Sequence, residues 1–230
     1  QVYLDADVQN QDPSSPTQAA RAPEESYTEE ERAWANDLFA KVVDGSDGEV
    51  QKHLQCYPAA AEHPLSDLVN LAHHLPHTNW VFLTPLGAAV VHGRAEVLRA
   101  LLEARADPEI KCQNVSSWDG AFTLTRTETP LCIAAQENHL DLCHILAQAN
   151  VGIDVLSSSE YLEGSVEWGE DDDGSEVMYY TALDSALAKG LDALGAELQK
   201  LGAKRSSELL EKPKNRPRRK MISQGSRMGA

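Results

Sequence analysis

The sequence predicts an all-α fold: a solenoid in which pairs of short helices stack side by side, joined by hairpins or extended finger loops. Two observations predict it. A block that begins Thr-Pro-Leu or Thr-Ala-Leu occurs three times, and in each block a short alanine-containing segment precedes a segment with leucines at helical spacing. A single unit of this kind cannot bury its apolar face alone, so the units must stack.

The three blocks begin at Thr84, Thr129 and Thr181. In each, the threonine caps the first helix, and the proline that follows it in two of them takes the first turn, where its missing N–H costs nothing. Paired alanines allow the two short helices to pack closely. A glycine after the first helix, such as Gly93, permits the left-handed residue that a tight turn requires. Leucine pairs in the second helix fill the space between neighbouring units.

An earlier unit lacks the Thr-Pro-Leu start. Order is expected to begin at Tyr27, followed by a capping box at Thr28–Glu31 in which hydroxyl and carboxylate satisfy N–H groups at the helix start. Apolar residues then recur with helical spacing until Gly45 ends the helix. A second capping box is predicted at Ser46–Glu49. We therefore expect a further helix pair before the first complete block.

The repeated pattern resembles the ankyrin repeat, whose consensus reads TPLHxAAxxGHxxxVxxLLxxGAD. Residues 84–107 and 129–150 match well, whereas residues 181–203 resemble a C-terminal cap and residues 34–57 an N-terminal cap. The resemblance implies one ankyrin-repeat solenoid over residues 27–210.

The chain departs from the family pattern in two ways. The consensus histidine is replaced by Gly87, Cys132 and Asp184, which predicts weaker turn hydrogen bonds. The units are also further apart than the ankyrin period of about 33 residues. Insertions are therefore expected near residues 59–79, 111–126 and 157–178, where the family places its hairpins. The first insertion contains a predicted short helix within Pro64–Leu71.

The two ends are expected to lie outside the folded domain. Residues 1–26 have little apolar periodicity and are predicted to be a disordered N-terminal arm, and residues 211–230 a flexible basic tail. The tail matches a nuclear-import or nucleic-acid-binding patch, and an anionic partner such as the chain's own acidic surface, a lipid face or RNA is an alternative. The residues assigned to this docking tail are Lys212, Lys214, Arg216, Arg218, Arg219 and Lys220.

Composition restricts the remaining function classes. The formal net charge of −16 disfavours general binding to nucleic acid or anionic lipid, and no specific nucleic-acid motif occurs. No apolar run is long enough to span a bilayer. Four cysteines without a CxxC pair predict a reducing intracellular compartment, either cytoplasm or nucleus, or an organelle if a targeting segment has been removed.

The ankyrin resemblance implies that a partner contacts the hairpin tips and the exposed end of each first helix. Carried over position by position, the expected protein-binding residues are Trp80, Val81, Leu83, Val91, His92, Arg126, Glu128, Gln136, Glu137, Met178, Tyr180 and Lys189. Several are large and apolar, which suits residues that anchor an interface. The alternative is that the chain's own insertions cover them.

Other clusters favour no catalytic chemistry. The acidic stretch from Glu160 to Glu176 could bind a basic partner or Ca²⁺, but it lacks EF-hand spacing and is better explained as a solvated loop. His73, His74 and His77 could hold a metal ion, but Pro76 interrupts the helix that would align them. Cys143 is interpreted as a buried structural thiol. We therefore expect no cofactor and no metal.

The favoured function is a non-catalytic adaptor or scaffold that mediates protein–protein interaction. Two alternatives are open. The chain could be a permanent structural or accessory subunit of a large multiprotein complex, organellar or membrane-associated, because its long insertions and two tails suit wrapping around neighbours. Less favoured is a metal-dependent enzyme that uses the histidine cluster. The sequence has no phosphate-binding loop, no GxSxG motif and no triad spacing.

Overall fold

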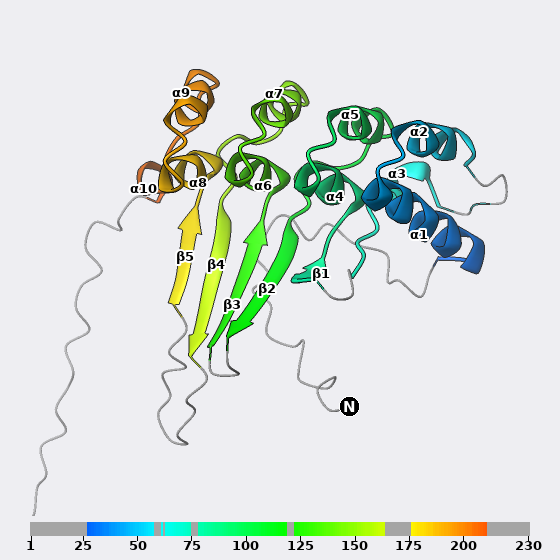
Figure 1. Cartoon of the computed structure of the whole chain (residues 1–230), viewed down its shortest axis with the longest axis horizontal. Coiled ribbons are helices and arrows are strands. Elements are labelled where there is room, and N and C mark those ends of the chain that lie inside the picture. Colours follow the sequence, from blue (N-terminus) through cyan, green and yellow to red (C-terminus); the bar gives the residue numbers. More distant parts are fainter. Residues whose placement is uncertain are drawn as a thin grey trace, which may run out of the picture.

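The computed structural model describes residues 27–57, 61, 63–74, 78–118, 122–163 and 176–210. These residues form stacked helix pairs from which a five-stranded sheet projects (Figure 1). The predicted repeat solenoid is present, but the predicted all-α class is wrong, because much of the inserted sequence forms antiparallel strands. The predicted arm at 1–26 and the basic tail at 211–230 lie outside the described residues.

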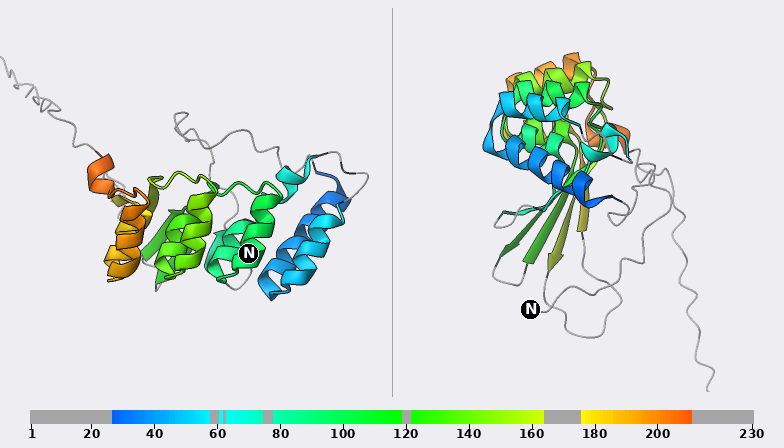
Figure 2. Two further views of the ribbon diagram at one scale, coloured as in Figure 1. Left: turned by 90° about the horizontal axis from the view of Figure 1, so that it is seen from above. Right: turned by 90° about the vertical axis from the view of Figure 1, so that its right-hand side faces the viewer.

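The helices lie in two layers (Figure 1 and Figure 2). The layer next to the sheet contains α1 (Glu29–Asp44), α4 (Pro85–Val91), α6 (Pro130–Gln136) and α8 (Ala182–Ala188). The second layer contains α2 (Asp47–Gln55), α5 (Ala95–Glu103), α7 (Leu140–Gln148) and α9 (Asp192–Lys200). Two short helices complete the set, α3 (Leu65–Leu68) within the stretch predicted to be helical and α10 (Ser206–Leu209).

The helix starts follow the predicted chemistry in four of the five capped positions. Thr84 Oγ1 accepts a hydrogen bond from the Gly87 N–H at 3.0 Å. Thr129 and Thr181 do the same for the third helical residue of α6 and α8. The capping box at Thr28–Glu31 is complete. The capping box predicted at Ser46–Glu49 is absent, because the Ser46 side chain makes no cap hydrogen bond.

The sheet is entirely antiparallel, in the order β1-β2-β3-β4-β5. Its strands are β1 (Trp80–Phe82), β2 (Cys112–Trp118), β3 (Phe122–Glu128), β4 (Ser157–Glu163) and β5 (Glu176–Tyr180). The strands extend away from the helix layers, and no described element covers either face of their far ends (Figure 1 and Figure 2, right). Long hairpins therefore stand where the family places short ones.

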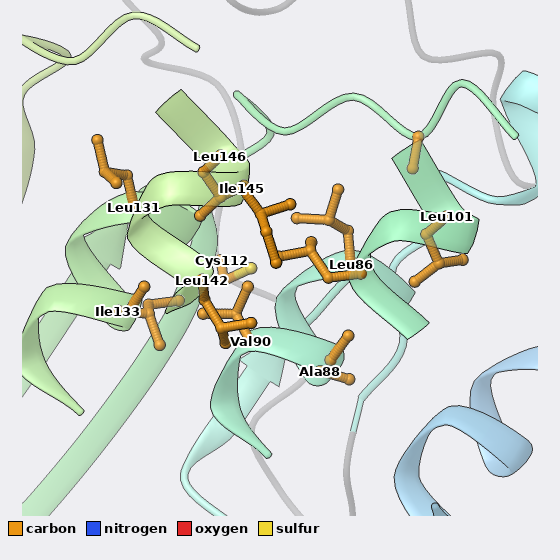
Figure 3. Close-up of a cluster of buried hydrophobic side chains, with 14 of the residues drawn as sticks. Leu86, Ala88, Val90, Leu101, Cys112, Leu131, Ile133, Leu142, Ile145 and Leu146 are labelled. Carbon is orange, nitrogen blue, oxygen red and sulfur yellow. The ribbon is translucent and has the colours of Figure 1, made fainter. Parts of the chain in front are cut away.

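The core is a band of leucine, valine and alanine side chains between successive helix pairs. Figure 3 shows Leu86 and Val90 of α4 facing Leu142 and Leu146 of α7, with Leu131 of α6 beside them. All five side chains are buried. Because each unit fills the space left by its neighbour, truncating one such leucine to alanine typically costs about 2–5 kcal/mol of unfolding free energy.

The loops that follow the second-layer helices are linked by a ladder of hydrogen bonds. In each rung a side-chain oxygen of one loop accepts from a backbone N–H of the next loop. The rungs are Asn70 Oδ1 with Asp107 N at 2.8 Å, Glu109 Oε1 with Gly152 N at 2.9 Å, and Asp154 Oδ1 with Lys204 N at 2.8 Å. The ladder fixes how far each unit is displaced from the previous one.

Gly87 occupies a position in α4 that has no room for a side chain. A Cβ atom there would lie 2.4 Å from Cys112 Sγ, the first residue of β2. Both residues are buried. The loss of the consensus histidine therefore coincides with a thiol from the next unit that fills the same space.

We expect Gly87→Ala to lower the free energy of unfolding by about 1–3 kcal/mol, because the added methyl group collides with Cys112. Urea unfolding followed by circular dichroism measures the change. Cys112→Ala in the same chain should recover part of the loss. The control is Gly48→Ala in exposed α2, where nothing lies within 4 Å and the change should stabilise by up to about 1 kcal/mol. Equal effects of the two alanine substitutions would contradict the packing argument.

His73 lies half-buried between the first and second units. Its ring stacks on Phe39 at a centroid distance of 4.3 Å, and its backbone pairs with Leu83. The Nε2 atom is buried and has no hydrogen-bond partner. Burial lowers the pKa of His73 to about 4 from 6.5. The folded state therefore requires this imidazole to be neutral.

We expect His73 to make the fold sensitive to mild acid. Between pH 6.5 and about 4 the unfolded chain takes up a proton at this residue that the folded chain does not, so stability falls as the pH falls. The contribution is up to about 1.4 kcal/mol per pH unit. His73→Phe should show a shallower decline in unfolding free energy between pH 7 and pH 5. An unchanged decline would show that other groups determine it.

Candidate protein-interaction surface

The strand register places three predicted binding residues, Trp80, Arg126 and Met178, in one row on a single face of the sheet. Residues directly opposite each other in neighbouring antiparallel strands point to the same side. The paired positions are Trp80, Asn114, Arg126, Ser159 and Met178, one from each strand. We call the face that carries this row the inner face. The residues two positions closer to the helices on the same face, such as Glu128, contact the first helix layer.

The inner face ends in a buried polar network at the junction with α6. Glu128 is only 3% exposed, and its Oε1 accepts hydrogen bonds from Tyr180 OH at 2.7 Å and from Gln136 Nε2. Burial, and next the negative charge of Glu128, raise the pKa of Tyr180. The network ties β3 and β5 to α6, so the angle between sheet and helices is supported by hydrogen bonds as well as by packing.

Beside this network, the exposed ends of α6 and α8 are connected. Lys189, just after α8, donates from Nζ to the Gln136 carbonyl oxygen at 2.7 Å and lies 4.0 Å from Glu137 Oε1. Both Lys189 and Glu137 are exposed. The surface that continues from the inner face onto the helix ends therefore presents charges of both signs.

The predicted binding residues fall into three groups in the structure. The exposed ones are Val81, His92, Arg126, Glu137, Met178 and Lys189. The half-buried ones are Trp80, Val91, Gln136 and Tyr180. The buried ones are Leu83 and Glu128, which face the protein interior and offer no surface to a partner.

The expectation that these residues form hairpin tips needs correction. Arg126, Glu128 and Tyr180 lie at the ends of their strands closest to the helices, because β2, β3, β4 and β5 extend the hairpins beyond them. Leu83 directly precedes the cap of α4 and pairs with His73 in the core. The predicted residues therefore lie along the elbow between sheet and helices.

Two exposed aromatic residues were absent from the predicted set. Tyr161 on β4 is partly exposed, and its cross-strand partner is Leu124. Tyr179 on β5 is 51% exposed and lies on the opposite, outer face, paired with Ser158. The signal that could have indicated Tyr179 is the Val-Met-Tyr-Tyr run at residues 177–180, since β-branched and aromatic residues are enriched in strands.

Two buried cysteines, Cys132 and Cys143, are held in unreactive settings. Burial raises the pKa of Cys132 to about 11 and that of Cys143 to about 12, so the thiolate is disfavoured at both. His73 is packed on Phe39, His74 is exposed beside it, and His77 lies outside the described residues. In the part of the chain that the structure describes, no group of three or more His, Cys, Asp or Glu residues is placed to hold a metal ion.

Stacked helix pairs, joined by antiparallel hairpins that project from one layer, define a helical-repeat protein. Residues 59–159 match the family model for ankyrin repeats, in three copies. The chain is thus an ankyrin-repeat protein, and the outer units at 34–57 and 181–203 add helix pairs of the same form beyond the matched residues. A search of curated proteins found no match.

The ankyrin assignment bears on function only in general terms. Ankyrin repeats are generally protein-interaction modules. Within the described residues, no helix is both long and apolar enough to cross a membrane.

We expect Tyr180→Phe to lower the free energy of unfolding by about 1.5–3 kcal/mol, because it removes a hydrogen bond to a buried carboxylate. The matched control is Tyr179→Phe, one residue earlier on the same strand and on the exposed outer face, which should change stability by less than about 0.5 kcal/mol. Thermal or urea unfolding of both variants makes the comparison. A Tyr180→Phe effect no larger than that of the control would show that Glu128 does not depend on the phenol.

Proposed function

We propose that this chain is a non-catalytic adaptor or scaffold that binds a protein partner along the elbow between the inner face and the ends of α6 and α8. The observation that carries the proposal is the row from Trp80 to Met178, which crosses all five strands without a described element above it. Arg126 and Met178 are its exposed members, Trp80 and Asn114 are half-buried, and the small Ser159 is buried. A surface of this length, fixed to a rigid helical stack, suits the recognition of a folded or extended partner.

The chemistry of the elbow supports a mixed apolar and polar contact. Met178 and half-buried Trp80 supply apolar area at the two ends of the row, and exposed Arg126 lies at its centre. Large apolar residues and arginine are the types that anchor protein interfaces. Arg126 and Lys189 are basic positions on a molecule of net charge −16, which favours a partner with acidic groups at these two points.

The decisive comparison uses two neighbouring residues on β3. Arg126→Glu places a negative charge on the inner face, whereas Thr127→Glu places the same charge on the outer face, because successive side chains of a strand alternate. We expect affinity purification with mass spectrometry to lose the partner with Arg126→Glu and to retain it with Thr127→Glu. Circular dichroism should show both variants folded.

Equal retention of partners by both variants would remove the inner face as the binding surface. Size-exclusion chromatography of a native extract tests the alternative of a permanent complex subunit, which the exposed apolar residues of the projecting sheet favour. A subunit would appear in a native extract only at a constant high mass, whereas an adaptor leaves a free pool.

A further inference from the structure

The two edges of the sheet are built differently. At one edge, β1 has three residues, its register with β2 shifts between Trp80 and Phe82, and the chain at His73 pairs with Leu83 just beyond it. Short length and an irregular register are features by which proteins protect sheet edges against further pairing. At the other edge, β5 pairs with β4 in unbroken register and has no other partner strand in the described chain.

The open edge strand carries three consecutive exposed apolar side chains. Val177 is 43% exposed, Met178 is 57% exposed and Tyr179 is 51% exposed. No lysine, proline or bulge interrupts residues 177–180. No described element lies along the edge of β5 that points away from β4, and α10 lies beyond the end of β5 closest to the helices (Figure 1). The strand therefore presents unpaired backbone groups together with apolar side chains on both faces.

We propose that β5 pairs antiparallel with β5 of a second copy of this chain, with Met178 on the two-fold axis. In this register Met178 faces its own equivalent on the inner face. Val177 of each copy faces Tyr179 of the other on the outer face, a β-branched residue against an aromatic one, which is a favourable cross-strand pair. A shift of one residue in either direction would break these matches, placing Met178 opposite Val177 or opposite Tyr179.

The charge distribution favours the antiparallel orientation. Thr181 Oγ1, directly after β5, donates to the Lys204 carbonyl oxygen at 2.8 Å, so Lys204 and Arg205 lie at the helix-proximal end of the strand. Their side chains are more than half exposed, and within the chain they pair with Asp154 and Asp184. Antiparallel pairing places the Glu176 end of β5 in one copy beside the end of β5 in the other copy at which these two basic residues lie. Parallel pairing would instead place the two Glu176 ends side by side.

The charge of Arg126 on the inner face does not oppose the contact. Arg126 of the two copies would be separated by five strand spacings, roughly 24 Å, which exceeds the screening length of about 8 Å at physiological salt. Because the pairing uses the same strand of both copies, it closes after two chains. The remaining outer edges are the two β1 strands, whose shortness and irregular register stop further addition. The expected assembly is a dimer and not a fibre.

A cysteine at the two-fold axis tests the register directly. In full-length chain with exposed Cys56 changed to Ser, Met178→Cys should oxidise to a covalent dimer, since facing Cα atoms lie about 4.5–5.5 Å apart, within disulfide range. Val177→Cys is the matched control, because residue 177 is diagonal to its own equivalent at about 7–8 Å. We expect at least tenfold more crosslinked dimer from Met178→Cys, detected by non-reducing gel electrophoresis.

A charge exchange tests the same contact without crosslinking. Light scattering of the full-length chain over a range of concentrations should show a dimer. Val177→Lys with Tyr179→Lys should give a monomer, because lysines would face each other twice. Val177→Lys with Tyr179→Glu should restore the dimer, since each lysine then faces a glutamate. Unchanged unfolding midpoints show that the variants remain folded, and Arg126→Glu on the inner face should leave the dimer intact.

Four results would overturn the proposal. These are a monomer at every concentration, a dimer that persists with both lysines, equal crosslinking at positions 177 and 178, or a dimer that forms only after residues 211–230 are deleted. The last result would mean that the chain's own tail occupies the edge of β5. Loss of a different protein, but not of self-association, from the double-lysine variant would assign the edge to a partner strand.

Discussion

The structure depends on one buried threonine at each junction between strand and helix. Thr84, Thr129 and Thr181 are 0–2% exposed, and each follows the last residues of a strand and caps the first-layer helix that starts with the next residue. The backbone at each is extended, and the hydroxyl oxygen satisfies an N–H group that burial would otherwise leave unpaired. The chain thus changes direction within a single residue, three times, and the sheet leaves the helices as one rigid elbow.

The third helical residue after each threonine contacts a residue from a later segment of the chain. Gly87 leaves space for Cys112, and Cys132 contacts Ser157, which also accepts a hydrogen bond from the Thr129 N–H. Asp184 accepts hydrogen bonds from Ser206 and Arg205 and so holds the start of α10. Burial raises the pKa of Asp184, but these hydrogen bonds outweigh the effect of burial and lower the pKa to about 2. The sequence predicted weaker turn hydrogen bonds here. In the structure, each replaced position lies against a residue of the segment that follows its own helix pair, Cys112, Ser157 or Ser206.

The helices could be predicted from the sequence because their signals are local. A threonine cap, a proline in the first turn and leucines at helical spacing lie within a few residues of one another. The strands were missed although β3 reads Phe-Thr-Leu-Thr-Arg-Thr-Glu, an alternation typical of a strand. Matching the chain to the ankyrin period classified this segment as an insertion, and the period carries no information about structure inside an insertion.

The candidate site was predicted in part for the same reason. Glu137 is exposed as expected, because the family pattern fixes where each first helix ends, and Arg126 is exposed on β3. Glu128 and Leu83 are buried, since burial there depends on tertiary partners, Tyr180 in one case and His73 in the other, that are far away in the sequence. Only the cross-strand register shows which side of the sheet a residue occupies, and register is a long-range property.

A solenoid has two ends. In this protein the ends of the helix layers and the edges of the sheet are terminated differently. The helix layers end in α1 and α2 on one side and in α8 and α9 on the other, where α10 is held to α8 through Asp184 and Ser206. The sheet is closed only at β1, because the first unit contributes a short irregular strand and no full hairpin. The last unit contributes a full hairpin, so its outer strand has no neighbour within the described chain. Lengthening the hairpins enlarges the inner face, and the same change leaves β5 as an edge that a second chain can complete.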